Sequence, residues 1–530
     1  MSRERKPRAR KRPRGAPTHV AQLPLRPTPR MRSVIDTRFY GGLRVYNACL
    51  GEALRRDRAL RADPRFEEAK ALPKGKPESP QGLARHQAFD AIDCAHGFTE
   101  SAIMSFGSWL RQSWVRDQVL CQEAQTLARR AFLAAERWHY GKGGKPRFKA
   151  QRRGIHSLEC KDGCGSLKVK FTKDNLTGLQ WGRGFVVPFA QPKSHDEQAE
   201  LDRITGLVAA GKLISCRITR AKVRGRWAYR AQFVLDGPPP VRHSVGTEQV
   251  SIDMGPSTVH VVSQTTAQHC QLAPGVAYAA KALRRAQRKL DRQHRKGSPS
   301  CFDAQRRHKS GRCDWNERSH NAQRTQVLVG ELHRVLSARR DTEHCQLANQ
   351  LIGLGPTLRA EKLNYVAWQK RFPKSVRDRA PGSFVAKLRH KAESAGGGLY
   401  EYDPRTTALS QTCICARQAK KPLSERTHRC PCGVVADRDL FSAFLGFFVE
   451  PKDGIDTLDA GEANAAYSTR HDLGGAPASR NAAGAAKQQV HRRSPSGRRS
   501  VVRIAKRLNR RSDRAARPKL VQPLPTATAA

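Results

Sequence analysis

The sequence has few acidic residues and no long apolar segment. Its 530 residues include 46 Asp and Glu against 98 Lys and Arg, which gives a formal net charge of +52. No apolar run approaches the roughly 20 residues that a helix needs to span a bilayer. The N-terminus MSRERKPRARKRPRGAP also lacks the apolar region of a secretory signal. We therefore exclude an integral membrane protein and a secreted protein, and expect a cytoplasmic one.

The large excess of positive charge indicates the class of partner. A surface this basic repels itself unless a polyanion neutralises it. Nucleic acid is the polyanion we expect, because each phosphate contact releases counterions and so favours binding. An anionic membrane surface is the competing partner. The chain length indicates two to four domains.

Paired cysteines are scarce as well. Most of the 14 cysteines stand alone, among them Cys301 and Cys313, and in a reducing compartment we interpret these as buried small side chains or unpaired thiols. One group has the layout of a metal site, namely Cys413, Cys415, Cys430 and Cys432. Four thiolates on two turns suit a tetrahedral Zn²⁺ ion, although Cys-x-Cys is tighter than the usual Cys-x2-Cys. His428 as a replacement ligand, and reduced thiols that bind no metal, are the alternatives.

Hydrophobic periodicity divides the chain into segments. Residues 1–32, rich in Arg and Pro, predict a disordered basic arm. Helical spacing predicts a helical domain over 41–140, and alternating residues predict a β-rich, barrel-like domain over 141–245 that includes a short strand at 33–40.

The second half of the chain mixes strands and helices. Residues 246–407 and 437–449 predict an α/β domain, beginning with the strand-turn-strand SIDMGPSTVHVV and containing a basic helix at 279–296. The cysteine segment 408–436 interrupts it. Residues 450–530, rich in Ala, Arg, Ser and Pro, predict a largely disordered basic tail.

Three acidic residues lie in separate segments that each predict a rigid element. Asp253 ends a strand, Glu361 lies in LRAEKLNY, and Asp439 begins an apolar helix. Alone, Asp253 is more typical of a turn, Glu361 of a solvated face and Asp439 of a helix N-cap. Together they suit two-metal phosphodiester hydrolysis, in which carboxylates hold two Mg²⁺ ions about 3.5–4 Å apart. Asp437 is the alternative to Asp439, and because the two point in different directions on a helix, we expect only one of them in the site.

The order SIDMG, RAEKLNY, cysteine ribbon and DRDLFSAFL resembles the RuvC-type nuclease of the transposon-encoded TnpB family and of the compact type V CRISPR effectors. The resemblance runs from about 245 to 447. It implies a multidomain α+β protein with an RNase H-like (RuvC) α/β nuclease core and a zinc-ribbon insert at 408–436. It further implies a β-barrel-like wedge domain at 33–40 and 141–245, and a helical recognition domain at 41–140.

The resemblance also assigns roles to individual residues. It implies that Asp253, Glu361 and Asp439 are the first, second and third catalytic acids and hold the two Mg²⁺ ions. A structural Zn²⁺ ion on the ribbon would fix where the helix that carries Asp439 begins. One departure stands out, because Phe441 and Ser442 replace the Asn-Ala of the family, and that Asn helps to order the site.

The function that the resemblance implies is an Mg²⁺-dependent, RNA-guided endonuclease that cuts DNA next to a short flanking motif. Its partners would be a guide RNA and double-stranded DNA, with the basic helix 279–296 lining their channel. Its place would be the prokaryotic cytoplasm, at the nucleoid when bound to DNA. The alternatives are a cleavage-deficient RNA-guided repressor and a guide-free nuclease or transposase.

Overall fold

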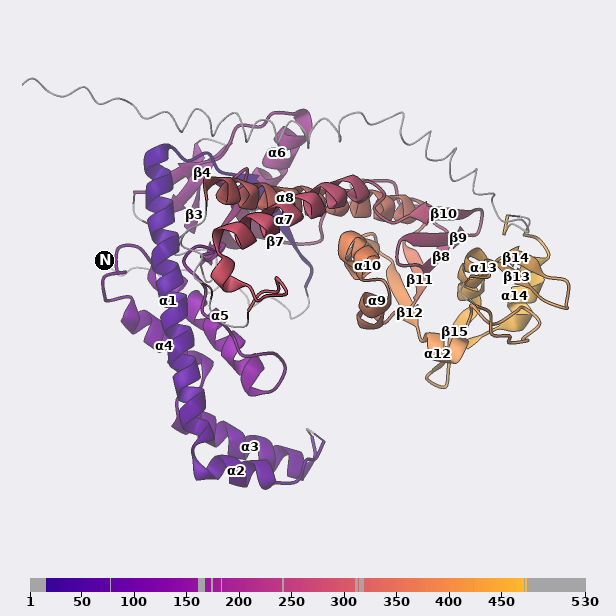
Figure 1. The fold of residues 1–530 in the computed structure, drawn as a ribbon, viewed down its shortest axis with the longest axis horizontal. Helices are drawn as coiled ribbons and strands as arrows, with labels where there is room; N and C mark the ends of the chain where they lie inside the picture. The colour runs from indigo at the N-terminus through magenta and orange to yellow at the C-terminus, as the bar shows by residue number, and fades with distance from the viewer. Residues whose placement is uncertain are drawn as a thin grey trace, which may run out of the picture. The chain divides into compact units, whose positions relative to one another are not determined.

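The computed structural model describes residues 16–473 except 77, 161–166, 173–174, 183, 241–242, 310–312, 314–318, 423 and 471. The chain divides into two units, shown in Figure 1: unit 1 comprises 1–222 and 226–239, and unit 2 comprises 223–225 and 240–530. None of the helices in the described part combines the length and apolar character that a bilayer crossing requires.

Unit 1 begins with one strand and a group of helices. Its helices are α1 (Pro29–Arg61), α2 (Pro64–Ala71), α3 (Pro80–Ala95), α4 (Glu100–Leu110), α5 (Cys121–His139) and α6 (His195–Ala209). Helix α1 starts at Thr28, whose hydroxyl accepts from the Met31 N–H at 3.3 Å, with Pro29 at the first helical position. Its buried face packs against α4 and α5.

Two small sheets complete unit 1. One has the order β1-β7-β6-β2 and the other β3-β4-β5. Their strands are β1 (Thr18–Pro24), β2 (Ser157–Glu159), β3 (Leu167–Thr172), β4 (Asn175–Trp181), β5 (Val186–Pro188), β6 (Leu213–Val223) and β7 (Arg226–Asp236). β1 pairs antiparallel with β7 along its whole length, so the N-terminal strand belongs to the sheet formed by the last hairpin of the unit.

The structure corrects two predictions at the N-terminal end. The predicted strand at 33–40 is wrong, because these residues lie inside α1. Ile35, Phe39 and Leu43 are buried at helical spacing, and this period outweighs the strand preference of the β-branched and aromatic residues. The predicted arm is wrong from Thr18 onward, where β1 begins, and residues 1–15 lie outside the described part.

Unit 2 has an α/β core. Its strands are β8 (Gln249–Met254), β9 (Thr258–Ser263), β10 (Ala267–Gln271), β11 (Thr357–Glu361), β12 (Gly398–Tyr402), β13 (Thr427–Arg429), β14 (Val435–Asp437), β15 (Val449–Lys452) and β16 (Ile455–Leu458). Its helices are α7 (Val276–Gly297), α8 (His320–Leu354), α9 (Tyr365–Arg371), α10 (Pro373–Arg379), α11 (Pro381–Ser394), α12 (Pro404–Thr407), α13 (Arg438–Leu445) and α14 (Ala460–Tyr467). Two 3₁₀ turns, η1 (Pro299–Cys301) and η2 (Gly446–Phe448), follow α7 and α13.

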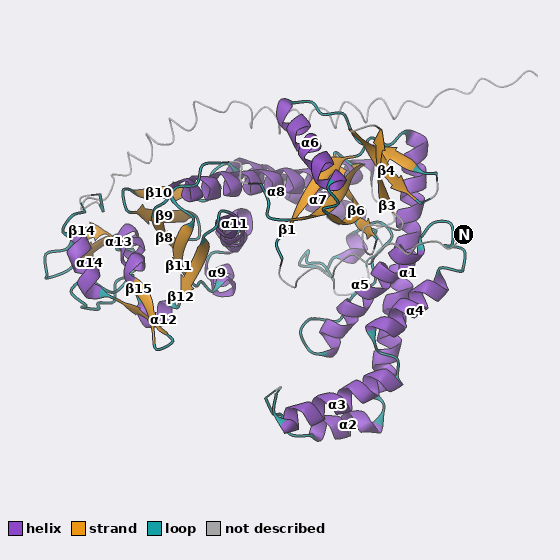
Figure 2. Cartoon of the chain, turned by 180° about the vertical axis from the view of Figure 1, so that it is seen from behind, coloured by secondary structure: helices purple, strands orange, loops and turns teal. Residues whose placement is uncertain are grey.

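The central sheet of unit 2 has the strand order β10-β9-β8-β11-β12. β10, β9 and β8 are antiparallel neighbours, whereas β11 runs parallel to both β8 and β12. The sheet is therefore mixed, with an antiparallel three-stranded part joined through β8 and β11 to a parallel part. Figure 2 shows α13 and α14 on one side of this sheet and α9 and α11 on the other.

The two faces of the sheet differ in character. One face is apolar and packs against α8 and α11, and its core contains Val250, Ile252, Val261, Leu358, Leu351 and Phe384. Because successive side chains alternate between faces, the intervening Asp253 and His260 lie on the opposite face. That second face carries the polar residues, together with the cluster in which Val262 and Tyr402 pack against α13.

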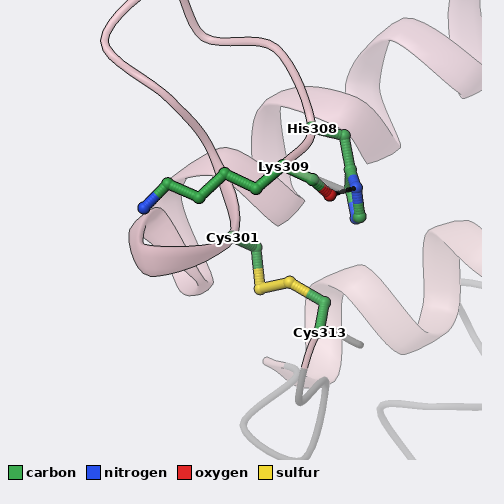
Figure 3. Close-up of a disulfide and its surroundings, with 4 residues drawn as sticks. All are labelled: Cys301, His308, Lys309 and Cys313. Carbon is green, nitrogen blue, oxygen red and sulfur yellow. Dashed lines mark hydrogen bonds between the residues drawn. A yellow bond between two sulfur atoms is a disulfide. The ribbon is translucent and has the colours of Figure 1, made fainter. Parts of the chain in front are cut away.

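The C-terminal part of unit 2 corrects two further predictions. The predicted disorder from residue 450 is wrong up to Tyr467, because β15, β16 and α14 occupy 449–467, while 474–530 lie outside the described part. The interpretation of Cys301 and Cys313 as unpaired is also wrong, since a disulfide joins them beside His308 (Figure 3). The two cysteines lie 12 positions apart in the sequence, and this spacing alone does not reveal that they pair.

A buried carboxyl in unit 1 predicts pH-dependent stability. Burial raises the pKa of Glu123 to about 7, although its carboxyl accepts the Leu120 N–H and the Trp181 indole N–H. The unfolded chain ionises near the ordinary value of 4.5, so the free energy of unfolding should fall by about 3 kcal/mol as pH rises from 4.5 to about 7. Urea unfolding at several pH values measures this change. The free energy of unfolding should depend less on pH in Glu123→Gln than in the wild type. In Glu68→Gln, on the exposed face of α2, the pH dependence should equal that of the wild type.

Candidate functional site

Five side chains form a row across the central sheet. Asp253 on β8 pairs with His260 on β9, which pairs with His269 on β10. On the other side, Ala360 pairs with Ile252, so the next residues along these parallel strands, Glu361 and Asp253, lie side by side. Glu361 in turn pairs with Tyr402 on β12. Paired residues share a sheet face, and so this row presents two carboxylates and two imidazoles on the polar face.

The carboxylates of the row interact electrostatically. Burial raises the pKa of Asp253 well above its usual range, and the charges of Glu361 and Asp439 raise it further. Burial also raises the pKa of Glu361. Half-buried carboxylates this close together favour protonation unless a cation neutralises them. Their oxygen atoms are ligands that Mg²⁺ accepts, so the residues present fit the predicted magnesium site.

Asp439 reaches this face from the start of α13. The Asp437 carboxylate caps the helix, and its Oδ1 accepts the N–H groups of Asp439 and Leu440, both at 3.0 Å. The Asp439 side chain extends from the first turn, where Oδ1 accepts from Arg438 at 3.0 Å and Oδ2 accepts from Arg426 at 2.8 Å. The cap role therefore falls to Asp437, and of these two carboxylates Asp439 has the larger electrostatic effect on Asp253.

The far end of α13 is anchored to the same sheet. Arg359 on β11 donates to the carbonyls of Phe447 at 2.8 Å and Val449 at 2.6 Å, directly after the helix. Gly446 permits the approach, because a Cβ there would lie 2.4 Å from Ser251 Oγ and 2.6 Å from the Tyr402 hydroxyl. Helix α13 thus packs against β8 and β9, and the η2 turn that follows it packs against β8 and β11, the two strands that carry the buried carboxylates.

Phe441, which replaces the Asn of the family, faces the core. Its side chain is 1% exposed and its ring centroid lies 4.4 Å from that of His428 on β13. It also contacts Phe444 and Tyr467, with centroids 6.2 and 5.8 Å away. The aromatic side chain therefore joins α13 to the cysteine ribbon and to α14, and stabilises the helix by packing.

The four cysteines converge as the sequence predicted. Sγ of Cys413 lies 3.6 Å from Sγ of Cys432, and Sγ of Cys415 lies 3.6 Å from Sγ of Cys430. All four sulfur atoms lie within 4.8 Å of one another, which suits one tetrahedral Zn²⁺ ion. His428 is not part of this group among the described residues, since its ring packs on Phe441 and its Nδ1 contacts Lys421.

The tight Cys-x-Cys spacing is accommodated by two matching turns. In the first, the Cys413 carbonyl accepts the Ala416 N–H at 2.9 Å, and in the second the Cys430 carbonyl accepts the Gly433 N–H at 3.0 Å. Ala416 and Gly433 both have left-handed backbone, with φ of 60° and 96°. Each turn reverses the chain immediately after the second cysteine, so both sulfurs of a pair face the other pair.

Sequence analysis missed the two histidines of the row. His260 lies opposite Asp253 because the turn after β8 is short, and His269 lies opposite His260 through the next hairpin. The strand-turn-strand pattern contained this signal, since hairpin register places residues on paired strands on one face. The same register, continued from β9 to β10, places His260 and His269 next to each other on the face of Asp253.

Removal of one ribbon cysteine should release zinc and lower stability. Cys432 is exposed, so Cys432→Ser loses little packing and its effect comes from the metal. We expect the loss of one equivalent of zinc by elemental analysis. A destabilisation of about 2 kcal/mol would lower the Tm of this unit by roughly 4–8 °C. Cys94→Ser, at an exposed cysteine outside the ribbon, should change neither, and equal zinc content in both variants would contradict the assignment.

Replacing Phe441 by the residue typical of the family should impair folding. Phe441→Asn places an amide in an apolar, fully packed position, so we expect a loss of at least about 3 kcal/mol in the free energy of unfolding. Chemical denaturation measures this change. Phe372→Asn, at a phenylalanine that is 41% exposed, is the matched control and should cost far less. Equal stability of the two variants would show that the aromatic packing is unimportant.

Comparison with known proteins identifies one segment. Residues 382–444 match the family model described as Cas12f1-like, TNB domain. These residues run from α11 through the cysteine ribbon and into α13. None of the curated proteins matches the chain.

Two solved structures show distant similarity. One is titled "Cryo-EM structure of the Cas12f1-sgRNA-target DNA complex", with a TM-score of 0.44 and 10% identity over 81% of this chain and 98% of that one. The other is titled "Cryo-EM structure of CRISPR-Cas12f Ternary Complex", with a TM-score of 0.27 and 13% identity over 78% of this chain and 81% of that one. Both likenesses are too distant to carry an argument. The matched TNB segment supports the predicted resemblance: this chain is similar to compact type V effectors and TnpB-like proteins.

Proposed function

We propose that this protein is an RNA-guided DNA endonuclease that hydrolyses phosphodiester bonds with Mg²⁺. The observation that carries the proposal is the convergence of Asp253, Glu361 and Asp439 on one sheet face, next to a cysteine ribbon of the Cas12f1-like TNB type. When bound, the metal would supply an activated water and stabilise the leaving oxygen. Asp253 and Glu361 would hold it from the rigid sheet, and Asp439 from the first turn of α13.

Arg426 and Arg438 both bind the Asp439 carboxylate and would therefore affect how Asp439 holds the metal ion. Arg426 is 62% exposed and binds Oδ2 of Asp439, so it can leave that oxygen at little cost when a cation is held there. Arg438 is 10% exposed and binds Oδ1 of the same carboxylate. The buried arginine would fix the direction of Asp439, while the exposed one would exchange between the carboxylate and a phosphate of the substrate.

A basic surface for the nucleic acid lies on α7. Lys281, Arg285, Arg288, Lys289 and Arg292 are all exposed on this helix. Its opposite face, which includes Ala279, Leu283 and Ala286, is buried against α8. Within the described residues none of the five cations forms an ion pair with a carboxylate, so their charge is available to phosphates. Guide RNA and double-stranded DNA are the partners that we propose for this surface.

The two arginines on Asp439 also favour a second candidate, an RNA-guided DNA binder that does not cut. If both arginines kept Asp439 from binding a cation, the protein would retain its partners and lose catalysis. The distinction is experimental, because the two candidates differ only in Mg²⁺-dependent cutting of a DNA that matches the guide.

The decisive experiment is cleavage of a matched plasmid by protein purified with its RNA. We expect Mg²⁺-dependent cutting, which Asp253→Ala should abolish while leaving the co-purified RNA in place. Asp341→Ala on α8, at a carboxylate that is 50% exposed and paired with Lys387, is the control and should cut at the wild-type rate.

Other results would refute the proposal in distinct ways. Cutting by Asp253→Ala at the wild-type rate would disprove the site assignment. Purification without a discrete RNA would favour a guide-free nuclease. Bound RNA and specific DNA binding without any cutting would establish the second candidate.

A further inference from the structure

A second group of potential metal ligands lies on the polar face, beside the three carboxylates. His260 on β9, His269 on β10 and Asp437 before α13 each offer one ligand atom, and these atoms lie within 4.8 Å of one another. The group shares no residue with the cysteine ribbon or with the proposed magnesium ligands. Three separate elements therefore bring two imidazoles and a carboxylate to one point.

The contacts of His260 suit a metal ligand. Its Nδ1 lies 2.8 Å from Nδ1 of His269, a separation that requires either a proton or a cation between the two nitrogens. Its other nitrogen, Nε2, lies 3.1 Å from the Thr258 hydroxyl. Histidines that bind metals commonly donate their second ring N–H to such an oxygen, which fixes the tautomer and orients the ring. His260 is 7% exposed, so its position is held by packing.

Asp437 can contribute a ligand atom to this group while it still caps α13. Oδ1 caps α13, whereas Oδ2 is directed toward His269 and lies 3.8 Å from its Nε2. The His269 side chain is 48% exposed, so the group is open to solvent on one side. An ion could enter there and keep water in its remaining positions.

We propose that His260, His269 and Asp437 form a binding site for a divalent transition-metal ion, with Zn²⁺ as its representative. Two imidazoles and one carboxylate favour such ions over Mg²⁺, which prefers oxygen ligands alone. The ion would tie the edge strand β10 to β9 and to the first residue before α13. Because His260 Nε2 also lies 3.7 Å from Asp439 Oδ2, the ion would help to set the position of Asp439.

Metal counting on the full-length chain tests this proposal. The protein is stripped with a chelator, reloaded with Zn²⁺, freed of excess metal and analysed for zinc per chain. We expect His269→Ala to retain one equivalent less than the wild type. His390→Ala, at an exposed histidine on α11, should retain the wild-type amount. Asp437→Asn, which keeps an oxygen to cap the helix, should also lose one equivalent. Equal zinc in wild type, His269→Ala and Asp437→Asn would overturn the proposal.

Co²⁺ separates this site from the ribbon. Cobalt bound by cysteine sulfur gives an intense thiolate-to-cobalt charge-transfer band, which a site of imidazole and carboxylate lacks. His269→Ala should therefore lower the bound cobalt by one equivalent and leave the charge-transfer band intact, whereas Cys432→Ser should remove that band. Loss of the band in His269→Ala, with the circular dichroism spectrum unchanged, would contradict two separate sites. Neither measurement depends on DNA cutting, so failure here is distinguishable from failure of the proposed nuclease function.

Discussion

The placement of two carboxylates side by side on a half-buried sheet face is the constraint on which unit 2 depends. Asp253 and Glu361 occupy adjacent positions on parallel strands, and burial raises the pKa of both. Such a pair is unfavourable unless protons or cations neutralise it. The apolar opposite face, packed on α8 and α11, holds the strands in register despite this cost. A third carboxylate, Asp439, adds to the negative charge, so the structure concentrates at one point the charge that a divalent cation would balance.

Helix α13 is held at both ends and along its length, which explains why a cysteine ribbon stands next to a carboxylate. Before the helix, the second Cys-x-Cys turn lies between β13 and β14. This hairpin ends at Asp437, directly before α13. After it, Arg359 binds two carbonyls, and Gly446 allows the backbone to touch the sheet. Phe441 fills the space between helix and ribbon. The direction of Asp439 is therefore set by the packing of α13 against the ribbon and the sheet.

On the polar face, the kind of potential metal ligand differs from strand to strand. Among the acidic and histidine side chains of this face, β8 and β11 supply carboxylates, while β9 and β10 supply imidazoles. Asp437 and Asp439 lie two residues apart at the start of α13. Oδ2 of Asp437 lies 3.8 Å from His269, whereas Asp439 raises the pKa of Asp253 and also lies 3.7 Å from His260. Hard and borderline cations differ in the donors they prefer, so two ions of different chemistry can lie next to each other without competing for the same ligands. The shared helix start would couple their occupancies.

The sequence alone determined what depends on local pattern. It predicted β8 and β9, the basic helix α7 and the convergence of the four cysteines. It also offered Asp253, Glu361 and Asp439 as catalytic acids, a role that stays a prediction. It failed where a local preference was overruled, as at residues 33–40, whose helical burial period outweighed their strand-forming side chains. Only the tertiary structure decided the pairing of Cys301 with Cys313, the inward orientation of Phe441, and the meeting of His260 and His269 with Asp437. The position of Phe441 and the meeting of the histidines with Asp437 depend on how α13 packs and on strand register, and such contacts between distant segments leave no periodic signal in the sequence.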